Sequence, residues 1–407
     1  MPRCLVWTLS FLFFSAAADP QIIPLNRILP SATWNINSVE GGSNLYLASI
    51  DDKSVLKNII ATTGGSSFTL DTLNAYSNDG TAKSLLLGND LSISTANTNA
   101  ITANLTGILY LTTRNQADDP NFSVYVIKDQ HLISTKPMKS TIVILNTWLP
   151  EFIDEDEPRR LSYVTGIQQA STVQLSFQWG IPPENWNTVN NNNTFFMNPM
   201  VLTNITTTTS WFFDHIEPLQ IGLDYWYLTS DGAMSMKIEK KYVPNRNYTT
   251  TAVNTTGLIV NDFLYQEHQV HFLRDDTRSG VSGLFASAFI PYGSLTFDIQ
   301  SGYTGIKYEL DRRTQIGWLY YAEDQATTLI VSTTTNTPGT FYCQYFTHAG
   351  QLYPVTTTVT TTAVQTTAMG EGVSTTTVGT STKGSGRSKG LGWIMLMGIL
   401  SFKFCDY

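Results

Sequence analysis

The chain has 407 residues and a formal net charge of -8, and only 14% of its residues are charged while 42% are hydrophobic. The sequence contains no basic patch, which argues against nucleic acid as a partner. Roughly 360 residues would remain without the two terminal signals predicted below, enough for two ordinary domains or one large one.

The N-terminus predicts a secretory signal peptide over residues 1–18. Arg3 supplies a positive charge, residues 4–14 form an apolar core, and residues 16–18 are alanines that precede a cleavage site. The apolar core is too short for a stable membrane span. The alternative is a buried N-terminal helix, but nothing amphipathic follows that would extend one.

Six N-x-S/T sequons agree with secretion, and each is a candidate glycan acceptor on a surface loop or strand edge. We expect most of them to be used, and the one within the run NNNNT is the clearest loop position. The six acceptors are Asn104, Asn121, Asn192, Asn204, Asn247 and Asn254.

The body of the chain predicts strands throughout. Runs of β-branched and aromatic residues alternate with turn signals such as TGGSS (63–67), and Ser54–Ile60 suggests one short helical turn. Many short strands with frequent turns indicate an all-β fold of sandwich or jelly-roll domains. The clearest predicted strands are 44–49, 108–113, 122–127, 140–146, 173–179, 224–230, 234–242, 268–274, 294–300, 306–310, 316–321, 328–333 and 340–346.

Two β domains are predicted, over residues 19–135 and 136–354. Near its end, each predicted domain has an aromatic-rich strand in which core-facing and outward-facing residues alternate. The segment 150–160 is acidic and then dibasic, so we expect a solvated loop in which Arg159–Arg160 is a candidate processing site. Cys343 is the one cysteine outside the predicted terminal signals, and the strand pattern around it predicts a small buried hydrophobe. The alternative is an intermolecular disulfide or a reactive thiol.

Residues 355–390 predict a Thr-rich, O-glycosylated stalk. Between residues 356 and 382, 13 of 27 residues are threonine and 2 are serine, with no aromatic. Such a segment cannot bury enough apolar surface to fold, and its composition is typical of glycosylated stalks.

Residues 391–407 predict the hydrophobic tail of a glycosylphosphatidylinositol (GPI) signal. The apolar run 391–402 is shorter than the roughly 20 residues that a span needs. A GPI signal needs only small residues, a polar spacer and a short apolar tail. The attachment candidates are Gly379, Gly384 and Ser385.

The expected location is therefore the extracellular face of the plasma membrane, reached through a lipid anchor. The final residues KFCDY are more polar than the end of a usual GPI signal. A soluble secreted protein and a short atypical span thus remain the alternatives.

The sequence predicts no catalytic residue, no cofactor and no metal site. It contains no G-x-S-x-G elbow, P-loop, G-x-G-x-x-G or H-E-x-x-H motif. His268 and His271 form an H-x-x-H pair within a strand pattern, where they would point to opposite faces. A glycosidase needs two positioned carboxylates, and sequence spacing cannot pair the available ones. Those considered are Asp214, Asp224, Glu267 and Asp311.

Three segments carry aromatic residues at adjacent positions: WFFDH (211–215), DYWYL (224–228) and GWLYY (317–321). In a strand, both faces then receive an aromatic, and one face must be core. The other face is either a contact between domains or an exposed platform for sugar or lipid. The candidate platform residues are Trp211, Trp226 and Trp318.

The phrases FSVYVI (122–127) and GTFYCQYF (339–346), together with the signal peptide, stalk and short tail, resemble nematode CUB-like surface and secreted proteins. The resemblance covers about residues 19–350. It implies CUB-like domains in an extracellular adhesion or defence-associated protein, not an enzyme, whose ligand is a glycan or a protein. The alternatives are a secreted or anchored carbohydrate-active enzyme and a structural, mucin-like surface glycoprotein.

Overall fold

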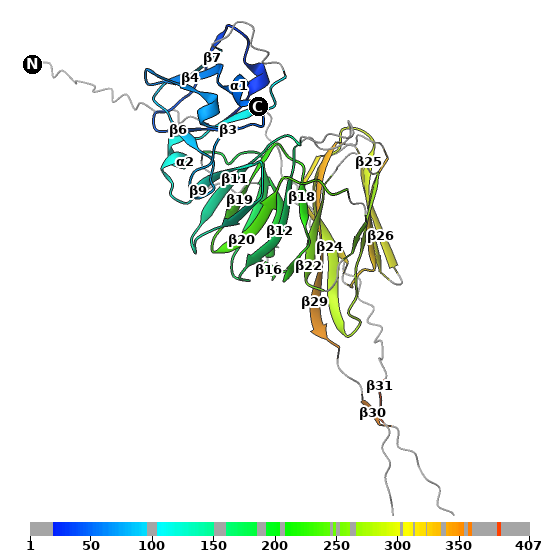
Figure 1. Cartoon of the computed structure of the whole chain (residues 1–407). Helices are drawn as coiled ribbons and strands as arrows, with labels where there is room; N and C mark the ends of the chain where they lie inside the picture. The colour runs from blue at the N-terminus through cyan, green and yellow to red at the C-terminus, as the bar shows by residue number, and fades with distance from the viewer. Residues whose placement is uncertain are drawn as a thin grey trace, which may run out of the picture.

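The computed structural model is almost entirely β, which confirms the predicted fold class (Figure 1). Among the residues that the structure describes, helices are limited to α1 (Lys53–Leu56), α2 (Arg114–Asp118) and the 3₁₀ turns η1 (Leu25–Arg27) and η2 (Leu70–Thr72). The structure describes residues 19–95, 104–149, 160–184, 193–203, 208–244, 247–249, 253–260, 266–301, 304–311, 314–322, 324–334, 339–353, 357–359 and 381–383.

The first unit is a small sandwich of two four-stranded sheets around an aliphatic core. In β4, alternate residues are buried, as expected for a strand with one core-facing side. Gly64 and Gly65 have positive φ and make the β4–β5 turn, which confirms TGGSS as a turn. One sheet holds β1 (Gln21–Pro24), β8 (Ile108–Leu111), β3 (Asn44–Ala48) and β6 (Ser84–Leu86). The other holds β2 (Thr33–Asn35), β7 (Ser92–Thr95), β4 (Ile59–Thr63) and β5 (Ser66–Thr69).

The second unit packs a five-stranded sheet against a four-stranded one around an aromatic-rich core. The larger sheet is antiparallel except for the parallel pair formed by its last two strands. Its strands are β14 (Thr194–Asn198), β13 (Leu175–Trp179), β19 (Tyr225–Ser230), β11 (Ser140–Asn146) and β9 (Phe122–Ile127). The smaller sheet holds β10 (His131–Ser134), β20 (Met234–Glu239), β12 (Ser162–Gln169) and β18 (Leu219–Ile221).

The third unit is a sandwich of two five-stranded sheets. One sheet holds β17 (His215–Ile216), β22 (Thr255–Val260), β29 (Thr340–Leu352), β24 (Arg278–Phe289) and β27 (Thr314–Ala322). The other holds β21 (Asn247–Thr249), β23 (Glu267–His271), β28 (Thr328–Thr333), β25 (Ser294–Ser301) and β26 (Thr304–Asp311). A separate hairpin pairs β15 (Met200–Thr203) with β16 (Thr208–Trp211).

Burial of β11 and β29 on both faces shows how the units pack. All seven residues of β11 are buried, as are residues 341–347 of β29. One face of β11 joins the core of the second unit, and the other contacts the first unit. One face of β29 lies in the third-unit core, and the other packs against the second unit. The three units therefore share continuous apolar junctions.

The pairing of strands differs from the predicted division at residue 135. β9 pairs with β11 and β10 pairs with β20, so two strands of the predicted 19–135 domain belong to sheets that continue beyond it. The predicted 136–354 domain contains the rest of one sandwich and the whole of another. The reason is that FSVYVI forms β9, the edge strand with which the second unit begins. The sequence pattern had suggested that this strand ends the first domain.

Within the predicted stalk, the structure describes two short strands, β30 (Thr357–Val359) and β31 (Ser381–Lys383), which pair antiparallel. The remainder of 355–390, the predicted signal peptide 1–18 and the predicted GPI-signal tail 391–407 lie outside the described residues. Cys343 is fully buried in the third-unit core, where burial raises the pKa of its thiol, so its prediction as a small hydrophobe is confirmed.

Candidate functional site

Trp226 is part of the core and cannot belong to an exposed binding platform. Its side chain is fully buried, with its ring centroid 4.9 Å from that of Phe177. Its indole Nε1 donates a 2.9 Å hydrogen bond to the Ser162 hydroxyl, so the polar atom of the ring is satisfied inside the protein. The structure therefore assigns Trp226 to the core of the second unit.

The opposite face of the same strand forms the junction with the first unit. Tyr227, next to Trp226, is fully buried in a cluster that includes Ile108 and Tyr110 of the first unit. Burial raises the pKa of the Tyr227 hydroxyl. For DYWYL, the interpretation as core on one face and domain contact on the other is confirmed.

Trp211 lies in the junction between the second and third units. Its ring is half-buried, 5.3 Å from Phe346 and 6.0 Å from His348 on β29, and 5.3 Å from Tyr321 on β27. Trp318 is on β27, but its side chain lies outside the described residues. The three tryptophans thus come from different layers, and the two whose side chains are described serve packing between strands.

A buried glutamine connects the same two units. Gln344 is fully buried on β29, where its Nε2 donates to the Met197 carbonyl at 2.8 Å and its Oε1 accepts from the Met197 amide at 2.9 Å. The same Nε2 donates to the Thr256 hydroxyl at 3.0 Å. Sequence reasoning missed this residue, although one glutamine inside the apolar run FYCQYF was the available signal.

Arg160 connects the first and second units in a comparable way. Its guanidinium is 9% exposed, lies 3.5 Å from the Asp224 carboxylate, and donates to the carbonyls of Thr106 and Asn146. Burial lowers the pKa of Arg160, while Asp224 and Asp51 offset part of this effect. Because the guanidinium is buried, cleavage at the candidate Arg159–Arg160 site would require this junction to open.

We expect Arg160→Met to lower the free energy of unfolding by about 1–3 kcal/mol, because it removes the donors to two carbonyl groups. Urea titration followed by tryptophan fluorescence measures the change. Arg114→Met is the matched control, since Arg114 forms an exposed ion pair with Asp118 at 3.4 Å. The control should lose less than about 0.5 kcal/mol. Equal losses in the two variants would contradict the role assigned to Arg160.

The two histidines of the H-x-x-H pair point to opposite faces of β23, as predicted. His268 is 1% exposed inside the third unit, and His271 is exposed. Among the residues that the structure describes, no cluster of three or more histidine, cysteine, aspartate or glutamate side chains could hold a metal ion.

The acidic residues considered for catalysis are placed in different surroundings. Asp224 lies by Arg160, and Asp214 accepts a 3.3 Å hydrogen bond from the Asn254 amide. Glu267 begins β23, and Asp311 ends β26 opposite Ser294. These four carboxylates therefore lie on four separate segments of the second and third units. The acidic run 154–157 lies outside the described residues.

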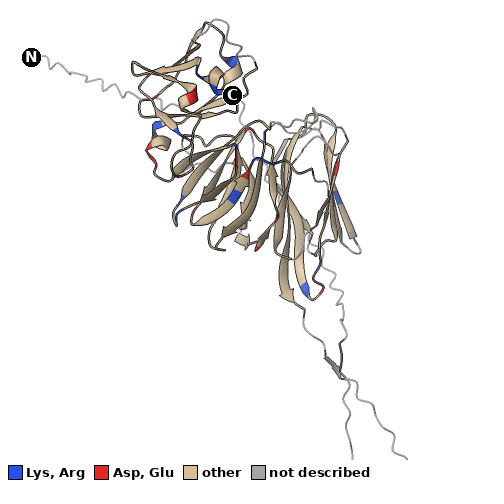
Figure 2. Cartoon of the chain, viewed as in Figure 1, with Lys and Arg blue, Asp and Glu red and all other residues tan. Residues whose placement is uncertain are grey.

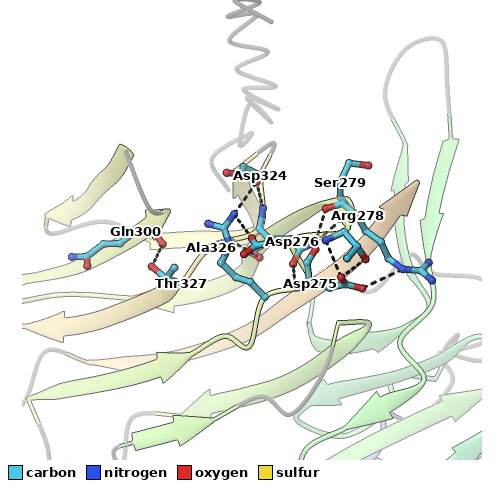
Figure 3. Close-up of polar contacts among 12 residues, drawn as sticks. Asp275, Asp276, Arg278, Ser279, Gln300, Asp324, Ala326 and Thr327 are labelled. Carbon is cyan, nitrogen blue, oxygen red and sulfur yellow. Dashed lines mark hydrogen bonds and ion pairs between the residues drawn. The ribbon is translucent and has the colours of Figure 1, made fainter. Parts of the chain in front are cut away.

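The end of the third unit from which the chain leaves is braced by polar contacts (Figure 3). Gln325 is 2% exposed and accepts from the Asp275 amide at 2.8 Å, while its Nε2 donates to the carbonyls of Asp275 and Arg278, both at 3.1 Å. The Tyr353 amide donates to the Thr277 carbonyl at 2.9 Å, immediately after β29.

Ion pairs between arginine and aspartate surround these hydrogen bonds. Arg278 lies 3.2 Å from the Asp275 carboxylate, and Arg274 lies 3.2 Å from Asp276 and 3.8 Å from Asp324. Elsewhere, charged residues are scattered over all three units (Figure 2). Positive and negative charges are therefore balanced within this group of contacts. The contacts hold the β23–β24 loop against Tyr353, where the chain leaves the third unit.

The predicted glycan acceptors occupy varied positions. Asn104 is exposed in a turn, and Asn121 is half-buried before β9. Asn254 has a φ of +62°, and its Oδ1 accepts a 2.8 Å hydrogen bond from the Ala349 amide. Asn247 is on β21, but its side chain is outside the described residues, as are Asn192 and Asn204. Use of these sequons remains a prediction.

The GPI attachment candidates Gly379, Gly384 and Ser385 also lie outside the described residues. Within the described part of the chain, no helix is both long enough and apolar enough to cross a membrane.

Over the described residues, these observations define an all-β protein of three sandwich units that are joined through buried junctions. The family profile described as "Glycoprotein: Transmembrane glycoprotein" matches residues 40–399, and the chain belongs to this family of transmembrane glycoproteins. The match includes the first unit from residue 40 onward, the second and third units, and residues 391–399 of the apolar run in the tail. Membership fits a surface or extracellular glycoprotein.

Among solved structures, the chain is similar to the CUB1-EGF-CUB2 domains of rat MASP-1, with 8% identity, a TM-score of 0.18, and coverage of 54% of this chain and 98% of that one. It is also similar to a chain of the lipid-containing bacteriophage PM2, with 10% identity, a TM-score of 0.15, and coverage of 82% and 88%. A third similarity is to a triple jelly-roll turret protein of an archaeal virus, with 10% identity, a TM-score of 0.14, and coverage of 79% and 83%.

No curated protein matches the chain. The expected resemblance to nematode CUB-like proteins stays a prediction. TM-scores this low carry no functional information, so the description of the fold rests on the sheets themselves.

Proposed function

We propose that the chain is a glycosylated, membrane-attached extracellular protein that acts in recognition or adhesion by binding rather than by catalysis. One observation carries the proposal: the first unit and the C-terminal end of β29 lie at opposite ends of the stacked units (Figure 1). If attachment to the membrane occurs beyond residue 352, the first unit is the part presented farthest from it. Membership of the transmembrane glycoprotein family supports attachment.

The proposed attachment is a GPI anchor. We expect phosphatidylinositol-specific phospholipase C to release most of the full-length protein from intact animal cells that express it. A combined Gly379→Leu, Gly384→Leu, Ser385→Leu variant is the control, because the attachment site requires small residues. It should lose enzyme-dependent release. Retention of the unaltered chain on treated cells would instead favour a span, and accumulation in the medium would contradict anchoring.

Glycan masking tests recognition by the first unit. Gly65→Asn creates the sequon N-S-S in the exposed β4–β5 turn, where a Cβ atom would meet nothing within 4 Å. Tyr292→Asn creates N-G-S at a site in the third unit that is 71% exposed. Suspension cells displaying each full-length variant are exposed to animal-cell monolayers and to beads coated with N- and O-glycans.

We expect cells displaying the unaltered chain to be retained, the Gly65→Asn glycan to reduce retention severalfold, and the Tyr292→Asn glycan to leave it unchanged. Equal retention for all three chains and untransfected cells would overturn the recognition proposal and favour a coat protein. Cleavage of the bead-bound glycans, detected by mass spectrometry, would favour the carbohydrate-active enzyme.

A further inference from the structure

A loop of the first unit covers an edge of the second unit. β9 is the last strand of its sheet, so the side away from β11 would otherwise be an open edge. The Ala82 amide donates to the Val124 carbonyl at 2.8 Å, and the Tyr76 hydroxyl donates to the Val126 carbonyl at 3.2 Å. We call the loop of residues 74–83 the strap.

The strap is itself a compact hairpin with two further points of contact. The Ser77 amide donates to the Thr81 carbonyl at 2.8 Å, which closes the hairpin. Ala82 is buried in the cluster between the first and second units, and Asn74 accepts a hydrogen bond from the Lys128 ammonium group beyond the end of β9. Open sheet edges invite pairing with other chains, so a covering loop of this kind has a protective role.

A histidine lies where the strap meets the second unit. The His131 ring is 5.0 Å from the ring of Tyr76 on the strap and 6.0 Å from that of Tyr125 on β9, and both contacts are edge-to-face. Its Nε2 is buried and has no hydrogen-bond partner among the described residues. Burial of this atom disfavours the imidazolium, because a protonated ring needs an acceptor for each of its two N–H groups.

The charged groups around His131 come from three elements. The strap contributes Asp79, whose carboxylate accepts from the Thr81 hydroxyl at 2.6 Å. The β9–β10 turn contributes Lys128 and Asp129. On the paired strand β20, Lys237 lies 3.4 Å from Glu239, and Lys240 follows them. The acidic and basic groups thus nearly balance, so burial of the ring is the dominant influence on the pKa of His131.

We propose that the strap is an acid-released cover: protonation of His131 loosens residues 74–83 from β9 and exposes the edge of that strand. Apart from Ala82, the hydrophobic cluster between the first and second units stays in place, as do Arg160 and the other contacts between the units. The change is therefore local to the strap, and the two units do not separate.

The sign of the pH effect follows from the surroundings of the ring. Burial lowers the pKa of His131 from its usual 6.5, and Asp129 and the Val126 carbonyl offset only part of this effect. When the strap lifts, the ring regains solvent and its ordinary pKa, so the released form binds the proton more readily. The strap contact is at full strength above about pH 6.5 and weakens as pH falls toward the lowered pKa.

Lys128 acts in a separate pH window. Burial lowers its pKa to about 8, with a smaller lowering effect from Lys240 and an opposing effect from Asp129. Burial penalises its ammonium form, so the free energy of the strap contact falls as pH drops from the ordinary lysine pKa toward 8 and is constant with respect to Lys128 below that. Between pH 7 and pH 5.5, the remaining pH dependence therefore belongs to His131.

Hydrogen exchange of the full-length chain, measured by mass spectrometry and corrected for intrinsic rates, tests this proposal. We expect protection of a peptide covering residues 74–83 to fall between pH 7.5 and pH 5.5, by about tenfold for each unit by which burial lowers the His131 pKa. A peptide covering β4 and β5, residues 59–69, should keep its protection over the same range.

His131→Phe keeps an aromatic ring between the two tyrosines but cannot titrate, so its strap protection should be independent of pH over this range. Asp79→Asn is the control for the other strap group, and it should behave as the unaltered chain does. Constant strap protection in the unaltered chain would overturn the proposal, as would an equal acid-dependent loss in His131→Phe. Neither outcome bears on whether the first unit recognises a ligand.

Discussion

Trp226→Ala should lower the free energy of unfolding by about 3–5 kcal/mol, the largest loss that we expect from a single substitution in this chain. The indole is fully buried between the two sheets of the second unit, close to Phe177 and Phe195. Truncation removes this contact area, leaves a cavity and deprives the Ser162 hydroxyl of its donor. Urea or thermal denaturation measures the loss.

Two further variants separate the contributions at this site. Trp226→Phe keeps much of the ring but loses the indole N–H, so it should cost less than Trp226→Ala. Tyr292→Ala removes an aromatic that is 71% exposed and should change stability by less than about 0.5 kcal/mol. If Trp226→Ala were as mild as Tyr292→Ala, the placement of Trp226 in the core would be wrong.

Gln344→Leu should cost about 2–4 kcal/mol, because the apolar side chain leaves both the amide and the carbonyl of Met197 without their partner. The loss should be concentrated at the junction between the second and third units. Hydrogen exchange should therefore show reduced protection in β14, which contains Met197. Cys343→Ala is the control, since the neighbouring side chain points into the third-unit core and should leave β14 unaffected.

Gln344→Glu tests the direction in which the free energy of unfolding changes with pH. A carboxyl group buried at this position has a raised pKa, because burial disfavours its charged form. Stability should then be highest at acid pH, where the group is neutral, and should fall as pH rises through the pKa of the unfolded chain toward that of the folded one. A Gln344→Glu variant whose stability is independent of pH between 4 and 7 would show that this position is hydrated.

The sequence predicted those strands in which β-branched and aromatic residues dominate. The predicted ranges 122–127, 140–146 and 328–333 coincide with β9, β11 and β28. The sequence did not reveal β24, which reads RSGVSGLFASAF and pairs with both β29 and β27. Small residues there permit close approach: a Cβ on Gly283 would lie 2.3 Å from the Tyr320 carbonyl oxygen. Propensity favours bulky residues in strands, so this one was missed.

The junction residues could be predicted only in part. Adjacent aromatics in DYWYL indicated a strand used on both faces, and this pattern correctly identified a contact between units. The partners of Arg160 and Gln344 lie far away in sequence, 54 residues for Thr106 and 147 for Met197. Local spacing contains no information about such pairs, because they exist only once separate sheets have docked.

The position of β29 has a mechanical consequence. This 13-residue strand lies between β22 and β24, and the chain leaves the third unit from its C-terminal end. A load applied beyond residue 352 would pull β29 along its own axis, so the hydrogen bonds to both neighbours would share the force in shear. Unzipping them one at a time would require a perpendicular pull. The unit is thus built to resist tension in the direction in which a tethered protein would experience it.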